Sequence, residues 1–147
     1  MDEPIIRDLS ESDLNQVLEI SKESFIIPWS LKSFINELLN QNSILKVAEL
    51  NGEVIGYVVA RKIVDEAEIL SLAVKKDFRR KGIATKLMKS VLNEIKDFVK
   101  SCFLDVRVSN EPAIKLYEKL GFKKVGIRKK YYLYPEEDAL LMKLDIS

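Results

Sequence analysis

Residues 44–63 have the sequence pattern of a β-hairpin. Ile44 to Leu50 and Val54 to Ile63 are strand-like, and the pair Asn51-Gly52 lies between them. Asn-Gly between two such segments is the strongest short-range hairpin signal, because both residues tolerate the positive φ of a tight turn. A third strand-like segment, Ala67 to Val74, follows directly. The sheet that these strands form needs helices to cover its apolar side chains.

The flanking sequence supplies helices. Ser10 and Ser30 each precede apolar residues at helical spacing, which predicts two capped helices before the hairpin. Asn110 caps a shorter helix that ends before Gly121. A longer helix begins at Gly82, before the helix that Asn110 caps. Its apolar face is formed by Ala84, Leu87, Met88, Val91, Ile95 and Phe98.

Three more strands complete the pattern. They are Cys102 to Val108, Phe122 to Arg128 and Ala139 to Leu144, and the last two flank a loop with Tyr131, Tyr132, Tyr134 and Pro135. The predicted order is ααβββαβαββ, an α/β (α+β) fold with a mixed central β-sheet flanked by helices. No repeat and no Ser- or Pro-rich linker interrupts the chain, so we expect one domain over residues 1–147.

Charge and hydropathy exclude several classes of protein. The 147 residues hold 24 Lys and Arg against 23 Asp and Glu, without a long run of one sign. This balance argues against specific binding of nucleic acid through a basic face. No apolar stretch is long enough to span a membrane, and Met1 to Pro4 lack the features of a secretory signal. We therefore expect a cytoplasmic protein that does not bind membranes.

The sequence contains no histidine and a single cysteine, Cys102. Ser-His and Cys-His nucleophile pairs are therefore excluded. Proton transfer near neutral pH must use a carboxylate, a tyrosine, a lysine, the cysteine or water. One cysteine forms no internal disulfide, and without a Cys/His cluster we expect no metal site. A buried, small apolar role is favoured for Cys102 over a nucleophilic one.

The run Arg79-Arg80-Lys81-Gly82-Ile83-Ala84 joins a strand to a helix. Free backbone N–H groups and the positive end of the helix dipole make such a start an anion site, and Gly82 allows a ligand close to the backbone. A pyrophosphate would fit there. The alternative is a solvated basic turn before an ordinary core helix. The G-x-x-x-x-G-K-[ST] spacing of a nucleotide P-loop is absent.

The same run matches the R/Q-x-x-G-x-G/A acetyl-coenzyme-A signature of the GNAT superfamily of N-acetyltransferases, and the element order resembles that fold over the whole chain. Other segments resemble its ribosomal-protein-alanine N-acetyltransferase branch: residues 25–30, 65–74, 104–110, 116–122, 131–132 and 137–139. The resemblance implies transfer of acetyl from acetyl-CoA to the N-terminal α-amine of a protein, such as the N-terminal alanine of a ribosomal protein. The amine would attack the thioester directly.

The resemblance also assigns binding residues. Those for acetyl-CoA are Leu72, Ala73, Val74, Arg79, Arg80, Lys81, Gly82, Ile83, Ala84, Thr85, Asn110 and Tyr117. The backbone of residues 72–74 would pair with the pantetheine arm, and Asn110 would both cap a helix and contact the coenzyme. Trp29, Tyr131 and Tyr132 would surround the acceptor peptide. The alternatives for these aromatics are a hydrophobic staple and an edge-strand cluster.

Two carboxylates compete for the role of general base. The family's base is a Glu in the strand before the short helix, and Asp105 occupies that position with a side chain one methylene shorter. A bridging water would restore the lost reach. Glu68 is the competitor, because many superfamily members use a Glu in its strand. Either acid could instead form a salt bridge. Tyr117 matches the family's general acid, although its spacing also suits the core face of a helix.

Other functions stay open on the sequence alone. Within the fold, the acceptor could be a small-molecule amine or a lysine, and no motif fixes the choice. In another class, the chain would be a non-catalytic acyl-CoA-binding module. The Glu-to-Asp change at Asp105 favours that alternative, whereas the presence of Glu68, Asn110 and Tyr117 counts against it.

Overall fold

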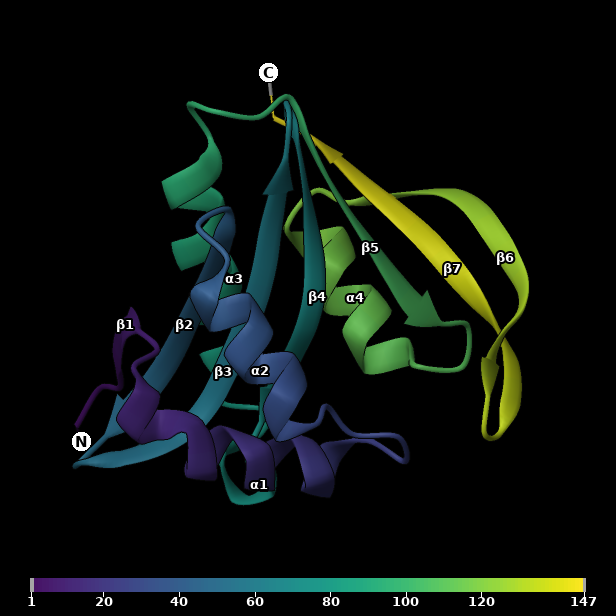
Figure 1. The fold of residues 1–147 in the computed structure, drawn as a ribbon. Coiled ribbons are helices and arrows are strands. Elements are labelled where there is room, and N and C mark those ends of the chain that lie inside the picture. Colours follow the sequence, from purple (N-terminus) through teal and green to yellow (C-terminus); the bar gives the residue numbers. More distant parts are fainter. Residues whose placement is uncertain (1, 147) are drawn as a thin grey trace.

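The computed structural model describes residues 2–146 as a seven-stranded sheet with helices on both faces (Figure 1). The elements in chain order are β1 (Ile5–Asp8), α1 (Leu14–Ser24), α2 (Leu31–Leu39), β2 (Ser43–Leu50), β3 (Glu53–Ile63), β4 (Glu66–Val74), α3 (Ile83–Ile95), β5 (Ser101–Arg107), α4 (Glu111–Lys119), β6 (Lys123–Leu133) and β7 (Glu136–Asp145). Short 3-10 turns precede α1 and α3. None of the helices in residues 2–146 is long and apolar enough to cross a membrane.

The strands lie in the order β1-β2-β3-β4-β5-β7-β6, and only β4 and β5 are parallel neighbours. Within residues 2–146 these two strands pair at three positions, from Glu66 opposite Ser101 to Glu68 opposite Phe103. Beyond Glu68 they diverge, as Figure 1 shows. The register of β4 against β3 also shifts there, so that Ile69 and Ser71 have partners on β3 and Leu70 has none. The sheet therefore opens at its centre.

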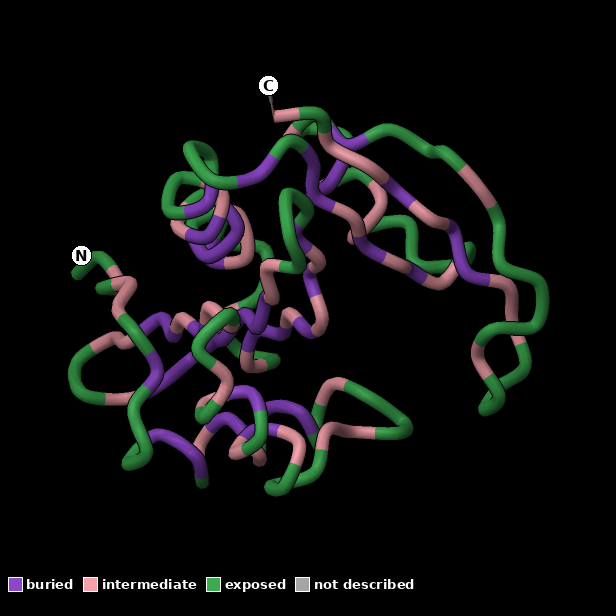
Figure 2. Tube along the Cα trace, turned by 45° about the horizontal axis from the view of Figure 1, so that its top comes forward, coloured by how far each residue is buried: buried purple, intermediate pink, exposed green. Residues whose placement is uncertain are grey.

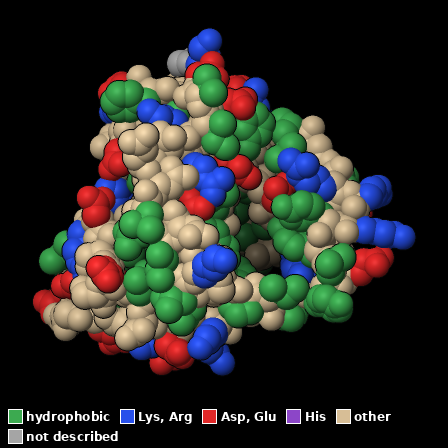
Figure 3. All heavy atoms as spheres, viewed as in Figure 1, with side chains coloured by type: hydrophobic (Ala, Val, Ile, Leu, Met, Phe, Trp, Pro, Cys, Tyr) green, Lys and Arg blue, Asp and Glu red, His purple; other side chains and the backbone are tan. Residues whose placement is uncertain are grey.

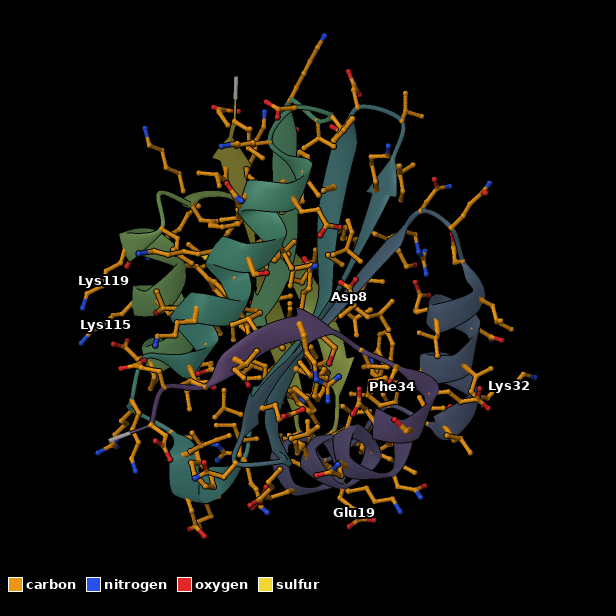
Figure 4. The ribbon with its side chains drawn as sticks, turned by 90° about the vertical axis from the view of Figure 1, so that its left-hand side faces the viewer. Asp8, Glu19, Lys32, Phe34, Lys115 and Lys119 are labelled. Carbon is orange, nitrogen blue, oxygen red and sulfur yellow. The ribbon has the colours of Figure 1, made fainter. Side chains whose placement is uncertain are left out.

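Two apolar clusters lie on the two faces of the sheet. On one face α3 and α4 pack through residues such as Leu87, Val91 and Tyr117. On the other, α1 and α2 pack through residues such as Val17 and Phe34. Figure 2 shows the buried residues concentrated along the central strands and on the inner side of helices such as α3, whereas β6 is exposed along most of its length. The helices are amphipathic accordingly: Phe34 points from α2 toward the sheet, whereas Lys32 points away from it (Figure 4).

The predicted helix starts at Ser30, Gly82 and Asn110 are confirmed, whereas Ser10 starts the 3-10 turn that precedes α1 rather than α1 itself. Ser30 accepts a hydrogen bond from Ser33 N, and Asn110 Oδ1 accepts one from Ala113 N at 3.3 Å. The mixed sheet with flanking helices is also as expected from the sequence. The hairpin turn forms at Asn51 and Gly52, which both have positive φ.

Three details differ from the sequence prediction. The order begins with an extra strand, β1, whose four residues are too few to show a clear alternation. Tyr131 and Tyr132 lie in β6 rather than in a loop, because β6 continues past a register shift between Arg128 and Tyr132. Phe98 lies beyond the end of α3 and is 65% exposed, so it does not extend the apolar face of that helix.

Candidate functional site

The two candidate bases line one pocket. It has a volume of about 280 Å³, lies where β4 and β5 are still paired, and is also bordered by Arg128 of β6. Glu68 and Asp105 are adjacent in the sheet, since Glu68 pairs with Phe103, two residues before Asp105. A larger hollow of about 560 Å³ lies elsewhere, between α3 and the end of β7, and contains no predicted site residue. The structure thus brings the two predicted carboxylates together.

Arg128 binds one of these carboxylates. Its Nε donates to Asp105 Oδ1 at 2.9 Å, and the Asp105 side chain is only 16% exposed. The Arg128 guanidinium also lies 5.8 Å from the centre of the Tyr131 ring. The neighbouring carboxylate raises the pKa of Arg128, so this side chain stays charged. Asp105 therefore forms the salt bridge that the sequence left open as its alternative role. It also lines the pocket.

Glu68 lies opposite an arginine that another carboxylate already engages. It pairs across β3 and β4 with Arg61, but the Arg61 guanidinium donates to both carboxylate oxygens of Glu37 on α2. Ser43 Oγ donates to Glu37 as well, at 2.6 Å. These donors hold the pKa of Glu37 below its usual value, against the opposing effect of burial. Because Glu37 neutralises Arg61, the charge of Glu68 is available to a ligand in the pocket.

Tyr117 projects from α4 into the apolar core. Its ring is 8% exposed and packs edge-on against Phe122, with ring centres 5.9 Å apart. Burial, and secondarily the nearby Tyr132 phenol, raises the pKa of Tyr117 well above its usual value. Tyr132 in turn faces Asp105, and its own pKa is raised to about 12, mainly by burial. Tyr117 is therefore a core residue whose hydroxyl is protonated at neutral pH.

The loop before α3 forms a backbone site for an anion. Arg80 and Gly82 have positive φ values of 64° and 79°, and Gly82 caps the helix. A Cβ placed on Gly82 would have no atom within 4 Å, so the space beside it is open. The first backbone N–H groups of a helix have no partner within it, and Ile83, Ala84 and Thr85 provide them here. These residues fit a pyrophosphate.

Arg79 has a structural role in this loop. Its Nε donates to Val74 O at 2.8 Å, and its Nη2 donates to Ser24 Oγ at 3.1 Å. The side chain thus ties the loop to the end of β4 and to α1. Lys81 lies over the Phe78 ring at 5.7 Å. The Arg79 side chain is therefore engaged within the protein, whereas the backbone N–H groups at the start of α3 are available to bind a phosphate.

The end of β4 is suited to an extended ligand. Leu72, Ala73 and Val74 pair with β3 on one side, whereas the pairing with β5 has already ended at Glu68. Main-chain groups of β4 therefore face the opening between the strands. Asn110 starts α4 and uses Oδ1 for its cap, which leaves the Nδ2 donors for a ligand.

The predicted acceptor residues divide into two groups. Trp29 stands apart from the pocket: its ring packs 5.1 Å from Phe34, and Phe34 packs edge-on against Tyr57 at 5.2 Å. This supports the packing alternative for Trp29. Tyr131 and Tyr132 of β6 pack edge-on at 5.1 Å, and the Tyr131 ring lies beside Arg128, which borders the pocket.

Figure 3 shows a hollow between α2 and the β6–β7 hairpin, with hydrophobic side chains on both sides of it. The exposed apolar residues of the α1–α2 loop are Phe25, Ile26 and Ile27, and those of β6 are Val125, Ile127, Tyr131 and Leu133. Arg107 fixes the hairpin tip, because it donates to Tyr134 O and Pro135 O at 2.9 Å each and lies 4.3 Å from the centre of the Tyr132 ring. Such a rim suits a peptide more than a small amine.

Sequence reasoning missed Arg61, Arg107 and Arg128. In strands, single arginines look like solvent-facing residues, and only the pairing register reveals their partners across the sheet. Arg61 opposite Glu68 is the one pair that a correct hairpin register would have indicated. Cys102 is fully buried, and burial raises the pKa of its thiol to about 12, which excludes it as a nucleophile at neutral pH.

Comparison with known proteins agrees with this arrangement. The sequence profile of the acetyltransferase (GNAT) family matches residues 14–122. The chain is 33% identical to the ribosomal protein bS18-alanine N-acetyltransferase of Escherichia coli K12, over 97% of each chain. It is 34% identical to the N-alpha-acetyltransferase of Sulfurisphaera tokodaii, over 93% of this chain and 90% of that protein.

The fold agrees as well. The crystal structure of the ribosomal-protein-S18-alanine N-acetyltransferase from Escherichia coli superposes with a TM-score of 0.91 and 32% identity, over 98% of this chain and 94% of that one. Ard1 from Thermoplasma volcanium also gives a TM-score of 0.91, at 27% identity over 99% of each chain. With the family profile, its relatives and the divided sheet in agreement, this chain belongs to the GNAT family of acetyltransferases.

Proposed function

We propose that this protein transfers an acetyl group from acetyl-CoA to the N-terminal α-amine of a protein, and that its acceptor is a ribosomal protein with an N-terminal alanine. The observation that carries the proposal is the pocket shared by Glu68 and Asp105 beside the opening between β4 and β5. The named activity of the Escherichia coli relative supports the choice of acceptor.

The carboxylates bind the amine and remove its proton. An α-amine has a pKa of about 7.7 to 8.0, so much of it is protonated at neutral pH and must lose a proton before it can attack. The negative pocket favours the ammonium form on arrival. Asp105 then accepts the proton, directly or through a water, and Glu68 provides the second negative charge. The short Asp105 side chain makes the water-mediated route the preferred one.

Acetyl-CoA supplies the activated acetyl thioester. The N–H groups at the start of α3 would hold its pyrophosphate, main-chain groups of residues 72–74 would bind its extended arm, and Asn110 Nδ2 would donate to it. Tyr117 Oη would donate a proton at the departing sulfur. The raised pKa of Tyr117 keeps its hydroxyl protonated at neutral pH, so that Oη can donate a hydrogen bond to the sulfur as negative charge develops there.

A panel of acceptors tests the proposal. The protein would be incubated with acetyl-CoA and with an alanine-starting peptide, the same peptide with a blocked N-terminus and an internal lysine, and simple amines. Mass spectrometry would score the products. Acetylation of only the free α-amine peptide is expected. Modification of the lysine or of the simple amines would favour the alternative acceptors, and no product at all, with acetyl-CoA bound, would favour a non-catalytic module.

A further inference from the structure

We propose that Arg128 is a positioning residue for the acceptor amine, and that it acts by orienting Asp105 in the shared pocket. The inference rests on the proposed function, since it concerns how the acceptor amine loses its proton. Arg128 lies on β6, two strands away from Asp105 in the sheet order, and its side chain reaches back across β7 to line the pocket.

The contact geometry supports orientation rather than simple neutralisation. Arg128 donates to Asp105 through Nε alone, at 2.9 Å, and so engages only Oδ1. Oδ2 is left as the oxygen that can accept from an amine or a water. The Tyr131 ring flanks the guanidinium and limits its freedom. A single contact at Oδ1 restricts the rotation of the carboxylate and keeps the other oxygen free.

The charges around Asp105 explain why orientation needs a cation. Glu66 and Glu68 of β4 and Arg128 of β6 line the pocket with Asp105. The Tyr132 phenol of β6 interacts with the charges of Asp105, Arg107 and Glu137. Lys143 of β7 lies over the Phe103 ring, and Arg61 of β3, which is engaged by Glu37, lies opposite Glu68. Arg107 is paired with Glu137, and Lys143 with Asp145. Arg128 is thus the cation left to offset repulsion between Asp105 and Glu68. The single cation of Arg128 against the three carboxylates of Glu66, Glu68 and Asp105 leaves the pocket negative for an ammonium.

Arg128→Gln tests the inference, with Arg128→Lys and Lys129→Gln beside it. Lys129→Gln removes the same charge from the adjacent residue, which is 80% exposed and contacts Asp138 at 3.5 Å. The readout is the pH profile of kcat and kcat/KM for an α-amine peptide. In the profile of kcat/KM, the ionisation of the free amine gives one limb, which is identical for every variant. The limb at lower pH reports the pocket carboxylates.

For Arg128→Gln we expect kcat and kcat/KM to fall together by about tenfold, and the lower limb to move to higher pH by about half a unit or more, because a cation beside the carboxylates is lost. In Arg128→Lys the low-pH limb of the profile should lie at the same pH as in the unmodified protein, because the positive charge is kept. The value of kcat should recover only in part, since an ammonium lacks the directed Nε contact. Lys129→Gln should match the unmodified protein.

Three results would overturn the inference. They are an unmoved lower limb in Arg128→Gln, a rise in KM with unchanged kcat, and an equal effect of Lys129→Gln. A double variant adds an independent check: in an Asp105→Asn background, measured at pH 9 where the amine is mostly neutral, Arg128→Gln should have no further effect. An unmodified protein that acetylates no α-amine peptide would contradict the proposed function itself, a different result from any of these.

Discussion

Tyr117 combines two roles that the sequence alone could not separate. Its ring fills the core under α4, and its hydroxyl keeps its proton at neutral pH because burial raises its pKa. Tyr117→Phe preserves the ring and removes only the donor. We expect kcat to fall by about 10²-fold with little change in the melting temperature. Tyr134→Phe, at an exposed position near the hairpin tip, is the control and should leave kcat unchanged. Full turnover in Tyr117→Phe would leave this residue with its packing role alone.

A second prediction at the residue scale concerns which of the two pocket carboxylates, Asp105 or Glu68, acts as the general base. Because Asp105 is oriented by Arg128, we expect Asp105→Asn to lower kcat by about 10²-fold at pH 6.5, where little free amine exists. Glu68→Gln should cost less than about tenfold, as it removes binding charge only. Asp105→Glu should keep activity, because it restores the longer side chain of the family. A larger loss in Glu68→Gln than in Asp105→Asn would transfer the role of base to Glu68.

At the scale of elements, the proposed phosphate site at the start of α3 can be tested by substituting Gly82, with a second glycine, Gly52, as the matched control. Gly82 and Gly52 both have positive φ, at 79° and 84°, and both have open space where a Cβ would go. Gly82→Trp should weaken acetyl-CoA binding by at least tenfold, because the side chain would fill the anion site. Gly52→Trp carries the same backbone strain at the β2–β3 turn and should leave binding unchanged. Calorimetry measures both, and equal affinities would place the pyrophosphate elsewhere.

The elements themselves were largely predictable, because apolar spacing and caps are local signals. Asn51-Gly52, Ser30 and Asn110 each predicted a turn or a helix start that the structure contains. The arrangement of the pocket was not predictable in the same way. The contact between Arg128 and Asp105 depends on β7 lying between β5 and β6, which no local pattern encodes. Trp29 was predicted from the family resemblance to contact the acceptor peptide, but in the structure its ring packs against Phe34.

At the scale of the whole molecule, the strand that the sequence analysis missed is held by charge. Arg7 of β1 donates to both oxygens of Asp13 at 2.8 and 2.9 Å, and to Glu49 of β2 at 2.8 Å. Ser10 N also donates to Asp13, whose side chain is only 5% exposed. These contacts join the sheet edge to the start of α1. They also lower the pKa of Asp13, with the Arg7 hydrogen bonds as the main cause.

The lowered pKa of Asp13 sets the sign of a pH effect on stability. A carboxylate whose pKa is depressed in the folded state stabilises it at pH values above about 4, its unfolded pKa, and this stabilisation is lost as the pH falls through the folded value. We expect Asp13→Asn to lower the free energy of unfolding by about 1–2 kcal/mol at pH 7, and the difference from the unmodified protein to shrink below about pH 4. Asp65→Asn breaks an exposed pair with Lys100 and should change stability little. Urea unfolding at several pH values measures these differences, and a loss in Asp13→Asn that is constant with pH would mean that the carboxylate charge does not hold β1 in place.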